Sequence, residues 1–231
     1  MSSPERAPDS QSAAPDTKEP PRPAPTRLLL VRHGESIWNQ ERRVQGQHDP
    51  PLSERGRRQA RELAEGVGQR LAGRRLAAFY SSDLRRAWET AEAVAEAVGR
   101  DPVPLPGLRE IALGAWEGKT REDLIAEYPA EWEAWTRRPS WDLVPGGEGA
   151  GRFEARVLAT LAHVQADLAA GDVLCLTHGG VIQVVLGSVV APGQGSDGVF
   201  PFLIENCSVT VLQRSGARVV VSAVNDTCHL S

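Results

Sequence analysis

The chain has 231 residues, of which 24% are charged, and its 26 Lys and Arg residues are nearly balanced by 30 Asp and Glu residues. The length allows one sizeable hydrophobic core, and the net charge of −4 argues against duplex nucleic acid as a partner, because its binders usually carry a basic domain. No apolar run approaches the ~18 residues of a membrane-spanning helix, so we expect no membrane partner either.

The three cysteines, Cys175, Cys207 and Cys228, are widely spaced and odd in number. They form neither a disulfide framework nor a C-x-x-C ligand pair, which favours the reducing cytoplasm as the location. His48, His163 and His229 show no metal-ligand spacing and are interpreted as loop or surface residues. We therefore expect no metal and no cofactor.

The first 26 residues differ in composition from the rest of the chain. They contain seven prolines among Ser, Asp, Glu and Ala and no aromatic residue. Such a segment buries too little apolar surface to offset its ordering entropy, so residues 1–26 are expected to be a disordered tail. The segment lacks the apolar region of a secretory signal. A tethering role is the alternative, and residues 27–231 are expected to form the folded domain.

From Arg27 onward, segments typical of strands and helices alternate. Apolar runs bounded by turn residues predict strands at 27–32, 77–81, 172–177, 207–213 and 218–224. Helices are predicted at 54–71, 83–98, 121–128, 130–137, 152–170 and 181–190, with a loop over 139–151. Ser53 and Asp83 are expected to begin their helices, and Thr120 to Asp123 resembles a capping box. The alternation predicts an α/β sandwich with a mostly parallel sheet and an antiparallel last pairing.

Two of the predicted strands run directly into a His-Gly pair. One segment is Leu28-Leu29-Leu30-Val31-Arg32-His33-Gly34, and the other is Val173-Leu174-Cys175-Leu176-Thr177-His178-Gly179-Gly180. If these strands are neighbours in a parallel sheet, both imidazoles meet at its carboxyl edge, where α/β folds bind ligands. A single histidine at a strand end is more simply a structural residue, but two of them favour a functional site.

Several further residues fit phosphate chemistry. The glycine after His33 lets a bulky group approach the backbone, and Arg32 could bind a phosphate through its guanidinium fork. The predicted helix after Ser81-Ser82-Asp83 carries Arg85 and Arg86, of which only one can face inward, because adjacent helical positions point about 100° apart. Glu110 could protonate a leaving alkoxide and later accept a proton from water. Solvated helix-face arginines and a surface glutamate are the ordinary alternatives.

Taken together, these residues resemble the histidine phosphatase superfamily, also called phosphoglycerate mutase-like, over nearly the whole chain from Arg27. The blocks that carry the resemblance occur in family order: residues 30–39, Gln45-Gly46 with 51–56, 81–91, 108–110, Pro145-Gly-Gly-Glu148 and Thr177-His-Gly-Gly180. The resemblance implies a three-layer α/β/α sandwich with a mostly parallel central sheet and a helical lid insertion at about 111–144.

The resemblance also implies a role for each residue of the site. His33 would be the nucleophile that becomes phosphohistidine, and Glu110 would be the proton donor and later the base. Arg32, Arg86 and His178 would bind the phosphoryl oxygens, with Arg86 rather than Arg85 matching the family. We expect a backbone carbonyl to fix the tautomer of His33. The other expected phosphate ligands are Asn39, Gln45, Gly46 and Gly179.

The expected function is hydrolysis of a small phosphorylated metabolite without a metal. Glu110 is followed by Ile111, not by the Arg-x-Tyr-Gly typical of mutases, which favours the phosphatase branch over a phosphoglycerate mutase. A non-catalytic interaction protein is the third hypothesis, and a homodimer is considered. Four tryptophans could line the substrate pocket or only pack the lid helices: Trp116, Trp132, Trp135 and Trp141.

Overall fold

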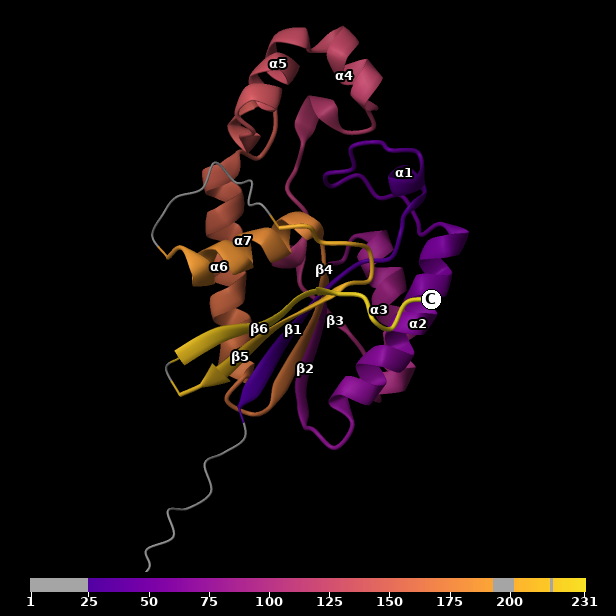
Figure 1. Ribbon diagram of the computed structural model, residues 1–231, viewed down its shortest axis with the longest axis vertical. Helices are drawn as coiled ribbons and strands as arrows, with labels where there is room; N and C mark the ends of the chain where they lie inside the picture. The colour runs from indigo at the N-terminus through magenta and orange to yellow at the C-terminus, as the bar shows by residue number, and fades with distance from the viewer. Residues whose placement is uncertain (1–24, 193–201, 217) are drawn as a thin grey trace, which may run out of the picture.

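The computed structural model describes residues 25–192, 202–216 and 218–231, and it is built around one sheet (Figure 1). The predicted tail at 1–26 therefore lies almost entirely outside the described residues. The sheet has six strands in the order β3-β2-β4-β1-β5-β6. The strands are β1 (Thr26–Arg32), β2 (Leu76–Ser81), β3 (Val103–Pro104), β4 (Asp172–Thr177), β5 (Val209–Ser215) and β6 (Arg218–Asp226).

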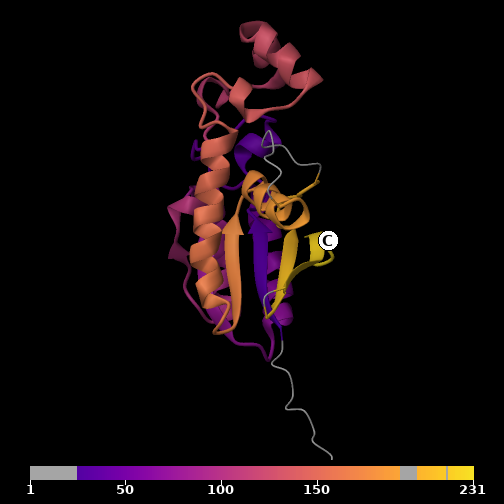
Figure 2. The same ribbon diagram turned by 90° about the vertical axis from the view of Figure 1, so that its left-hand side faces the viewer.

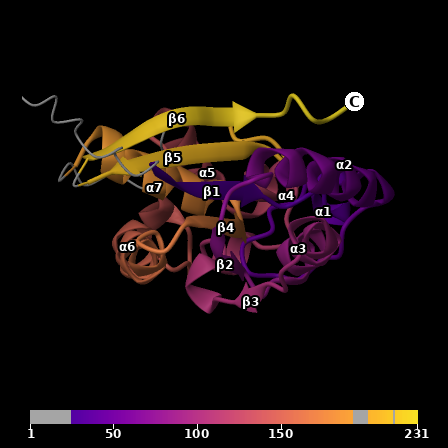
Figure 3. The ribbon, with the colours of Figure 1, turned by 90° about the horizontal axis from the view of Figure 1, so that it is seen from below.

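The mostly parallel sheet and its antiparallel last pairing are confirmed, whereas the antiparallel pairing of β1 with β5 was not predicted. The pairs β1–β4, β2–β4 and β2–β3 are parallel, whereas β1–β5 and β5–β6 are antiparallel. The two-residue strand β3 was not predicted, since so short a segment carries no periodic pattern. From Arg218 onward β6 runs antiparallel to β5, and Figure 3 shows these two strands at one edge of the sheet.

Helices cover both faces of the sheet, which confirms the expected sandwich. Figures 1 and 2 show α6 and α7 on one face, and Figure 1 shows α2 and α3 on the other. The α-helices are α1 (Ile37–Gln40), α2 (Glu54–Leu71), α3 (Arg85–Val98), α4 (Arg121–Glu127), α5 (Pro129–Arg137), α6 (Ala150–Asp167) and α7 (Gly179–Val190). Short 3-10 helices are η1 (Pro106–Leu108), η2 (Gly114–Trp116) and η3 (Trp141–Leu143).

The central strands supply both halves of the core. Side chains alternate between the faces of a strand, so Leu28 and Leu30 pack with α6 and α7, whereas Leu29 and Val31 pack with α2 and α3. All four are at most 2% exposed. A strand that is buried on both faces has an uninterrupted run of apolar residues. This is why β1 and β4 could be predicted from the sequence.

The register of β1 and β4 brings the two histidines together. Leu28 lies opposite Val173 and Arg32 lies opposite Thr177. Each strand is followed by its histidine, and the backbone N–H of His33 donates to the carbonyl of Thr177 at 3.0 Å. The two imidazoles therefore lie at the carboxyl edge of the sheet, as expected.

Two of the three predicted helix starts are confirmed. Ser53 caps α2 by accepting from the Gly56 N–H, and Thr120 and Asp123 form a capping box on α4. The prediction for Asp83 is wrong, because α3 begins at Arg85 after an N-cap without a side-chain hydrogen bond. The Asp83 carboxylate is instead bound by Arg109, at 2.7 Å from Nε, and is not available to cap the helix.

The segment predicted as a lid forms α4, α5, η2 and η3. Figures 1 and 2 show α4 and α5 at one end of the molecule, beyond the carboxyl ends of the parallel strands. The predicted loop at 139–151 contains η3 and the first residues of α6. Among the described helices, none is long and apolar enough to cross a bilayer.

Candidate active site

His33 is fixed in one neutral tautomer by its two hydrogen bonds. Nδ1 lies 2.6 Å from the carbonyl oxygen of Gly34, which can only accept, so Nδ1 carries the proton. Nε2 lies 3.2 Å from Nε of Arg86, which can only donate, so Nε2 bears the lone pair. A backbone carbonyl thus holds the imidazole as expected, with the lone pair of Nε2 toward the Arg86 guanidinium.

The surroundings of His33 keep it neutral. The side chain is 3% exposed, and burial, the charge of Arg86 and the charge of Arg32 together place its pKa well below the usual value of 6.5. The hydrogen bond to Gly34 opposes this shift without cancelling it. His33 therefore remains a neutral imidazole at neutral pH.

Arg86 is one of two cationic side chains that line the cavity beside His33. Its Nη1 donates to the carbonyl of His48 and its Nη2 to the carbonyl of Gly46, both at 2.8 Å. The guanidinium is 1% exposed, and burial lowers its pKa to about 10, so it remains charged at neutral pH. Its neighbour Arg85 points outward and pairs with Glu89, which decides between the two arginines.

Arg32 is the second cation. Its Nη1 donates to the carbonyl of Ile204 at 2.6 Å, while its Nε is buried without a hydrogen-bond partner. Burial lowers its pKa. A buried guanidinium nitrogen without a partner is costly, and an oxyanion bound between Arg32 and His33 would relieve that cost.

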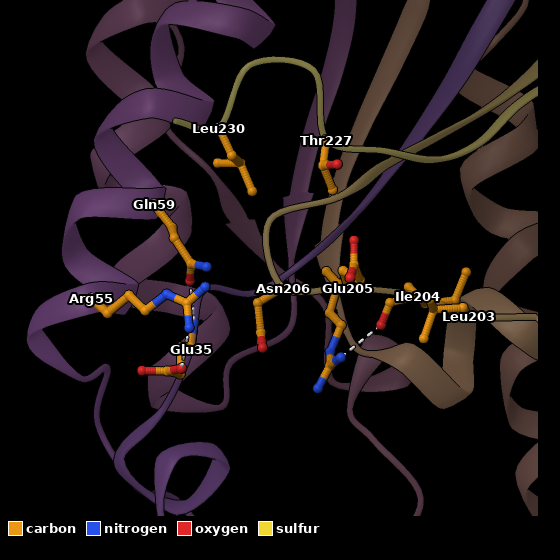
Figure 4. Close-up of a pocket in the computed structure, with 10 residues that line it drawn as sticks. Glu35, Arg55, Gln59, Leu203, Ile204, Glu205, Asn206, Thr227 and Leu230 are labelled. Carbon is orange, nitrogen blue, oxygen red and sulfur yellow. Dashed lines mark hydrogen bonds and ion pairs between the residues drawn. The ribbon is translucent and has the colours of Figure 1, made fainter.

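Arg32 also lines a second, more polar pocket of about 310 Å³. Figure 4 shows Arg55 directed toward Glu35 on one side of this pocket, with Asn206 between that pair and Ile204. Asn206 donates from Nδ2 to the carbonyl of His33 at 2.9 Å. The pocket wall thus contributes to holding the backbone of the His33 segment.

His178 stands beside His33, with 5.1 Å between the ring centroids. Its Nε2 is 2.8 Å from the hydroxyl of Ser82, whereas its Nδ1 is buried without a partner. Burial, Arg86 and then His33 lower the pKa of His178 well below 6.5. His178 is therefore a neutral group, and an N–H at its Nδ1 could donate to a phosphoryl oxygen. Its role as a phosphoryl ligand stays a prediction.

Glu110 faces the same cavity as His33. Its two carboxylate oxygens accept from the backbone N–H groups of Ile111 at 3.0 Å and of Gly180 at 3.1 Å. Arg156 and Gln47 donate to its backbone carbonyl. The carboxyl group is therefore held in place from the first turn of α7 and from its own loop.

His33 and Glu110 lie at the wall of a cavity of about 300 Å³, which His178 does not line. Its charged lining residues are Arg32, Arg86 and Glu110, together with His33. The predicted ligands Gln45 and Gly46 also line it, and so do seven apolar residues: Val44, Leu113, Trp116, Leu124, Trp132, Trp135 and Trp141. The structure therefore brings together most residues named from the sequence.

Three predicted ligands stand apart from this lining: His178, Asn39 and Gly179. Asn39 belongs to the capping box of α1, where its Oδ1 accepts from the backbone N–H of Ser36 at 3.1 Å. Gly179 is the first residue of α7, and a Cβ there would lie 3.8 Å from Nε of Arg32. Their roles as phosphate ligands stay predictions.

Sequence reasoning missed two supporting residues. Ser82 binds His178, and its place directly after β2 was the available signal. Glu117 accepts through Oε1 from the N–H groups of Gln47 and Leu113, at 2.9 and 2.8 Å. Glu117 thereby joins the loop whose carbonyls hold Arg86 to the loop that follows Glu110. Nothing in the local pattern distinguished it from a surface glutamate.

Within the described ranges, no group of three or more His, Cys, Asp or Glu residues is positioned to hold a metal ion. The positive charges of the site come instead from Arg32 and Arg86, which both line the cavity beside His33. Such an arrangement suits the binding and polarisation of a phosphoryl group by guanidinium donors.

Comparison with known proteins agrees with this geometry. The family model of the histidine phosphatase superfamily (branch 1) matches residues 28–227. Phosphoserine phosphatase 1 of Hydrogenobacter thermophilus is 33% identical over 204 residues, which cover 88% of this chain and 94% of the relative. A probable phosphoglycerate mutase of Yersinia pestis is 31% identical over 208 residues, with coverage of 88% and 94%.

Solved structures show the same fold. YhfR of Bacillus stearothermophilus is 32% identical, with a TM-score of 0.77 and coverage of 89% of this chain and 100% of the other. A mycobacterial glucosyl-3-phosphoglycerate phosphatase in complex with VO3 is 32% identical, with a TM-score of 0.71 and coverage of 87% and 100%. The match over almost the whole folded region shows that the chain belongs to branch 1 of the histidine phosphatase superfamily.

Proposed function

We propose that the protein hydrolyses phosphate monoesters through a phosphohistidine formed on His33. The observation that carries this proposal is the tautomer of His33, whose unprotonated Nε2 faces Arg86 in the cavity. Nε2 is the atom that would attack phosphorus. The names of several relatives support phosphatase activity, since they include a phosphoserine phosphatase and a glucosyl-3-phosphoglycerate phosphatase.

In the first step, the lone pair of Nε2 on His33 forms a bond to phosphorus while the bond between phosphorus and the ester oxygen breaks. Glu110, in its protonated form, donates its proton to the departing alkoxide. Arg32 and Arg86 stabilise the negative charge on the three remaining phosphoryl oxygens. His178 adds a neutral hydrogen bond from Nδ1 when Ser82 donates to its Nε2.

In the second step, water attacks the phosphohistidine and the phosphorus–nitrogen bond breaks. Glu110, now a carboxylate, takes a proton from this water, and inorganic phosphate leaves. The electron pair of the broken bond returns to Nε2, so His33 regains its starting form. The cycle draws its positive charge from the two arginines and requires no metal.

The decisive test is a comparison of His33→Ala with the native chain on p-nitrophenyl phosphate in the presence of EDTA. The native protein should hydrolyse the ester, and the variant should lose more than about 10³-fold in kcat, in keeping with the loss of other nucleophiles. Denaturing quench of the native reaction should trap acid-labile phosphate on the chain. His163→Ala, which changes an exposed histidine of α6 outside the cavity, is the matched control.

Unchanged turnover in His33→Ala would overturn the mechanism. Interconversion of 2- and 3-phosphoglycerate much faster than release of phosphate would instead favour a mutase. Failure of the native protein to form phosphohistidine with any monoester would favour a non-catalytic role. A small phosphorylated molecule is thus the partner that we propose, and a homodimer stays a prediction.

A further inference from the structure

The cavity above His33 has a charged end and an apolar remainder. All charged lining residues belong to the proposed phosphoryl site: Arg32, Arg86 and Glu110. Apart from Gln45 and Gly46, the other lining residues are aliphatic or aromatic. The part of the substrate beyond the phosphoryl group would therefore contact mainly apolar side chains.

Four tryptophans form a continuous group in this wall. Trp116 and Trp135 are in edge contact with 5.4 Å between centroids, Trp135 and Trp141 are 4.7 Å apart, and Trp116 and Trp132 are 6.2 Å apart. Trp132 and Trp135 are three residues apart on α5, so they share one face of that helix. These indoles pack against one another and also line the cavity, so the interpretation that they only pack the lid helices is wrong.

The exposed fractions of the four indoles show which of them belong to the core and which leave surface open to the cavity. Trp116 is 2% exposed and belongs to the core, whereas the three other indoles are only partly buried. Helix α5 contains no fully buried residue. Partly buried indoles that face a cavity leave apolar area which a ligand could cover, and covering it is favourable.

A second acidic group on the substrate would lack a cationic partner here. Arg121, with its guanidinium 6.0 Å from the centroid of Trp132, is exposed and does not line the cavity. Placing a carboxylate among indole and leucine side chains without a cation costs free energy, because its hydration is lost without replacement. The cavity wall therefore selects against phosphoglycerate-like and phosphoserine-like esters.

We propose that the preferred substrates are monoesters whose alcohol is apolar or aromatic and carries no second charge. This inference rests on the proposed function and deepens it by naming the substrate class. It differs from the acidic substrates named for two relatives, phosphoserine and glucosyl-3-phosphoglycerate. The four tryptophans would hold the alcohol portion, while Arg32 and Arg86 hold the phosphoryl group.

The test compares 2-phenylethyl phosphate, ethyl phosphate, phosphoserine and 3-phosphoglycerate, all of which are alkyl esters. Aryl phosphates have better leaving groups than alkyl phosphates. Comparing alkyl esters alone therefore prevents a difference in leaving group from being mistaken for a binding preference. The native protein should show a kcat/KM for 2-phenylethyl phosphate at least about tenfold above that for each other ester, from the buried aromatic area.

Trp135→Ala removes the indole at the centre of the tryptophan group. It should reduce kcat/KM for 2-phenylethyl phosphate by about tenfold, mainly through KM, and change that for ethyl phosphate by less than about twofold. Trp135→Phe should be intermediate and guards against a general loss of folding. Trp88→Ala is the matched control, because Trp88 lies on α3 outside the cavity and its indole N–H donates to Glu92.

Each outcome decides the inference. Faster hydrolysis of phosphoserine or 3-phosphoglycerate, or equal activity on ethyl and 2-phenylethyl phosphate, would overturn it while the proposed function stands. An equal loss on both uncharged esters in Trp135→Ala would also overturn it. Inactivity of the native protein on all four esters and on p-nitrophenyl phosphate would overturn the proposed function as well.

Discussion

The chemistry of His33 is set by three neighbours on three different segments. Gly34 accepts from Nδ1, Arg86 donates to Nε2, and Asn206 donates to the backbone carbonyl. Because the first two partners have fixed roles as acceptor and donor, only the neutral tautomer satisfies both. Protonation of Nε2 would place two donors face to face beside a buried guanidinium.

We therefore expect His33 to remain neutral at pH 6.0, where an ordinary histidine is mostly protonated. Its pKa is lowered by burial, Arg86 and Arg32, so the unfolded chain binds this proton at about pH 6.5 and the folded chain does not. The free energy of unfolding should accordingly fall as the pH falls below about 6.5. Nitrogen-15 shifts of the histidines would check the protonation state, with His33→Ala as the assignment control.

A resonance of His33 that titrates at the usual value would contradict this description. The dependence of activity on pH should agree. After correction for the ionisation of the substrate phosphate, whose second pKa is about 6, the acidic limb of kcat/KM should lie well below pH 6.5 if the neutral form of His33 attacks.

Among the secondary-structure elements, the beginning of α7 positions Glu110, the proposed proton donor. Glu110 accepts from the N–H of Gly180 in the first turn of this helix. A Cβ on Gly180 would collide with Oε1 of Glu110. A glycine is needed at this position because of that close approach, while α7 itself is otherwise rich in buried aliphatic residues.

Gly180→Ala should therefore displace the Glu110 carboxylate and reduce kcat by about 10- to 100-fold, the range expected for a misplacement of about 1 Å. Gly151→Ala is the matched control, because Gly151 lies in the first turn of α6 and a Cβ there meets no atom within 4 Å. That control should keep full activity and gain up to about 1 kcal/mol in helix stability. Native kcat in Gly180→Ala would show that the placement of Glu110 does not limit turnover.

The first residues of β1 and β4 are joined by a buried ion pair at the opposite edge of the sheet. Asp172 is 2% exposed and lies 2.7 Å from Nη2 of Arg27 and 2.6 Å from Nε of Arg74. Burial by itself would raise the pKa of Asp172, but hydrogen bonds from Arg74 and Arg27 outweigh it and hold the pKa below its usual range. The carboxylate thus fastens two strands and the loop that precedes β2.

Asp172→Asn should lower the free energy of unfolding by about 2–4 kcal/mol, since it leaves two cations without their counter-charge. A lowered pKa gives stability that is present above the unfolded value near 3.9 and is lost as the pH falls through the folded value. Urea unfolding at pH 7 and pH 3 would measure both effects. Asp101→Asn, at an exposed position between α3 and β3, should change stability by less than about 0.5 kcal/mol.

In the molecule as a whole, the candidate active site lies along the carboxyl edge of a sheet that is buried on both faces. The two halves of the core pack against the same central strands, β1 and β4. Their carboxyl ends hold Arg32, His33 and His178, and α3 adds Arg86, within an acidic molecule of net charge −4. Binding of an anion at this edge would therefore stabilise the entire fold rather than one local segment.

Inorganic phosphate, the proposed product, should accordingly raise the melting temperature. At about 100 times its Kd, phosphate would add about 2.7 kcal/mol, which corresponds to a rise of about 5–10 °C for a chain of this size. Chloride at equal ionic strength should give a much smaller change. The phosphate effect should disappear in Arg86→Ala, and an equal rise in that variant would place phosphate elsewhere.

The apolar pattern of the chain is enough to predict five of the six strands and the proximity of His33 to His178. Apolar runs that end in His-Gly predicted β1 and β4, because a strand buried on both faces is a nearly continuous run of apolar residues. Parallel pairing then required His33 and His178 to meet. The resemblance assigned Arg86, and the structure shows the reason, since Arg85 points outward to Glu89.

The folded structure was needed to show which further side chains complete the site. It joined Trp116, Trp132, Trp135 and Trp141 from η2, α5 and η3 into one wall, and it revealed that Ser82 and Glu117 support the site. It also showed that Asp83 binds Arg109 instead of capping α3. These outcomes depend on contacts between segments far apart in the chain, and no local periodicity records which distant partner a polar or aromatic side chain will meet.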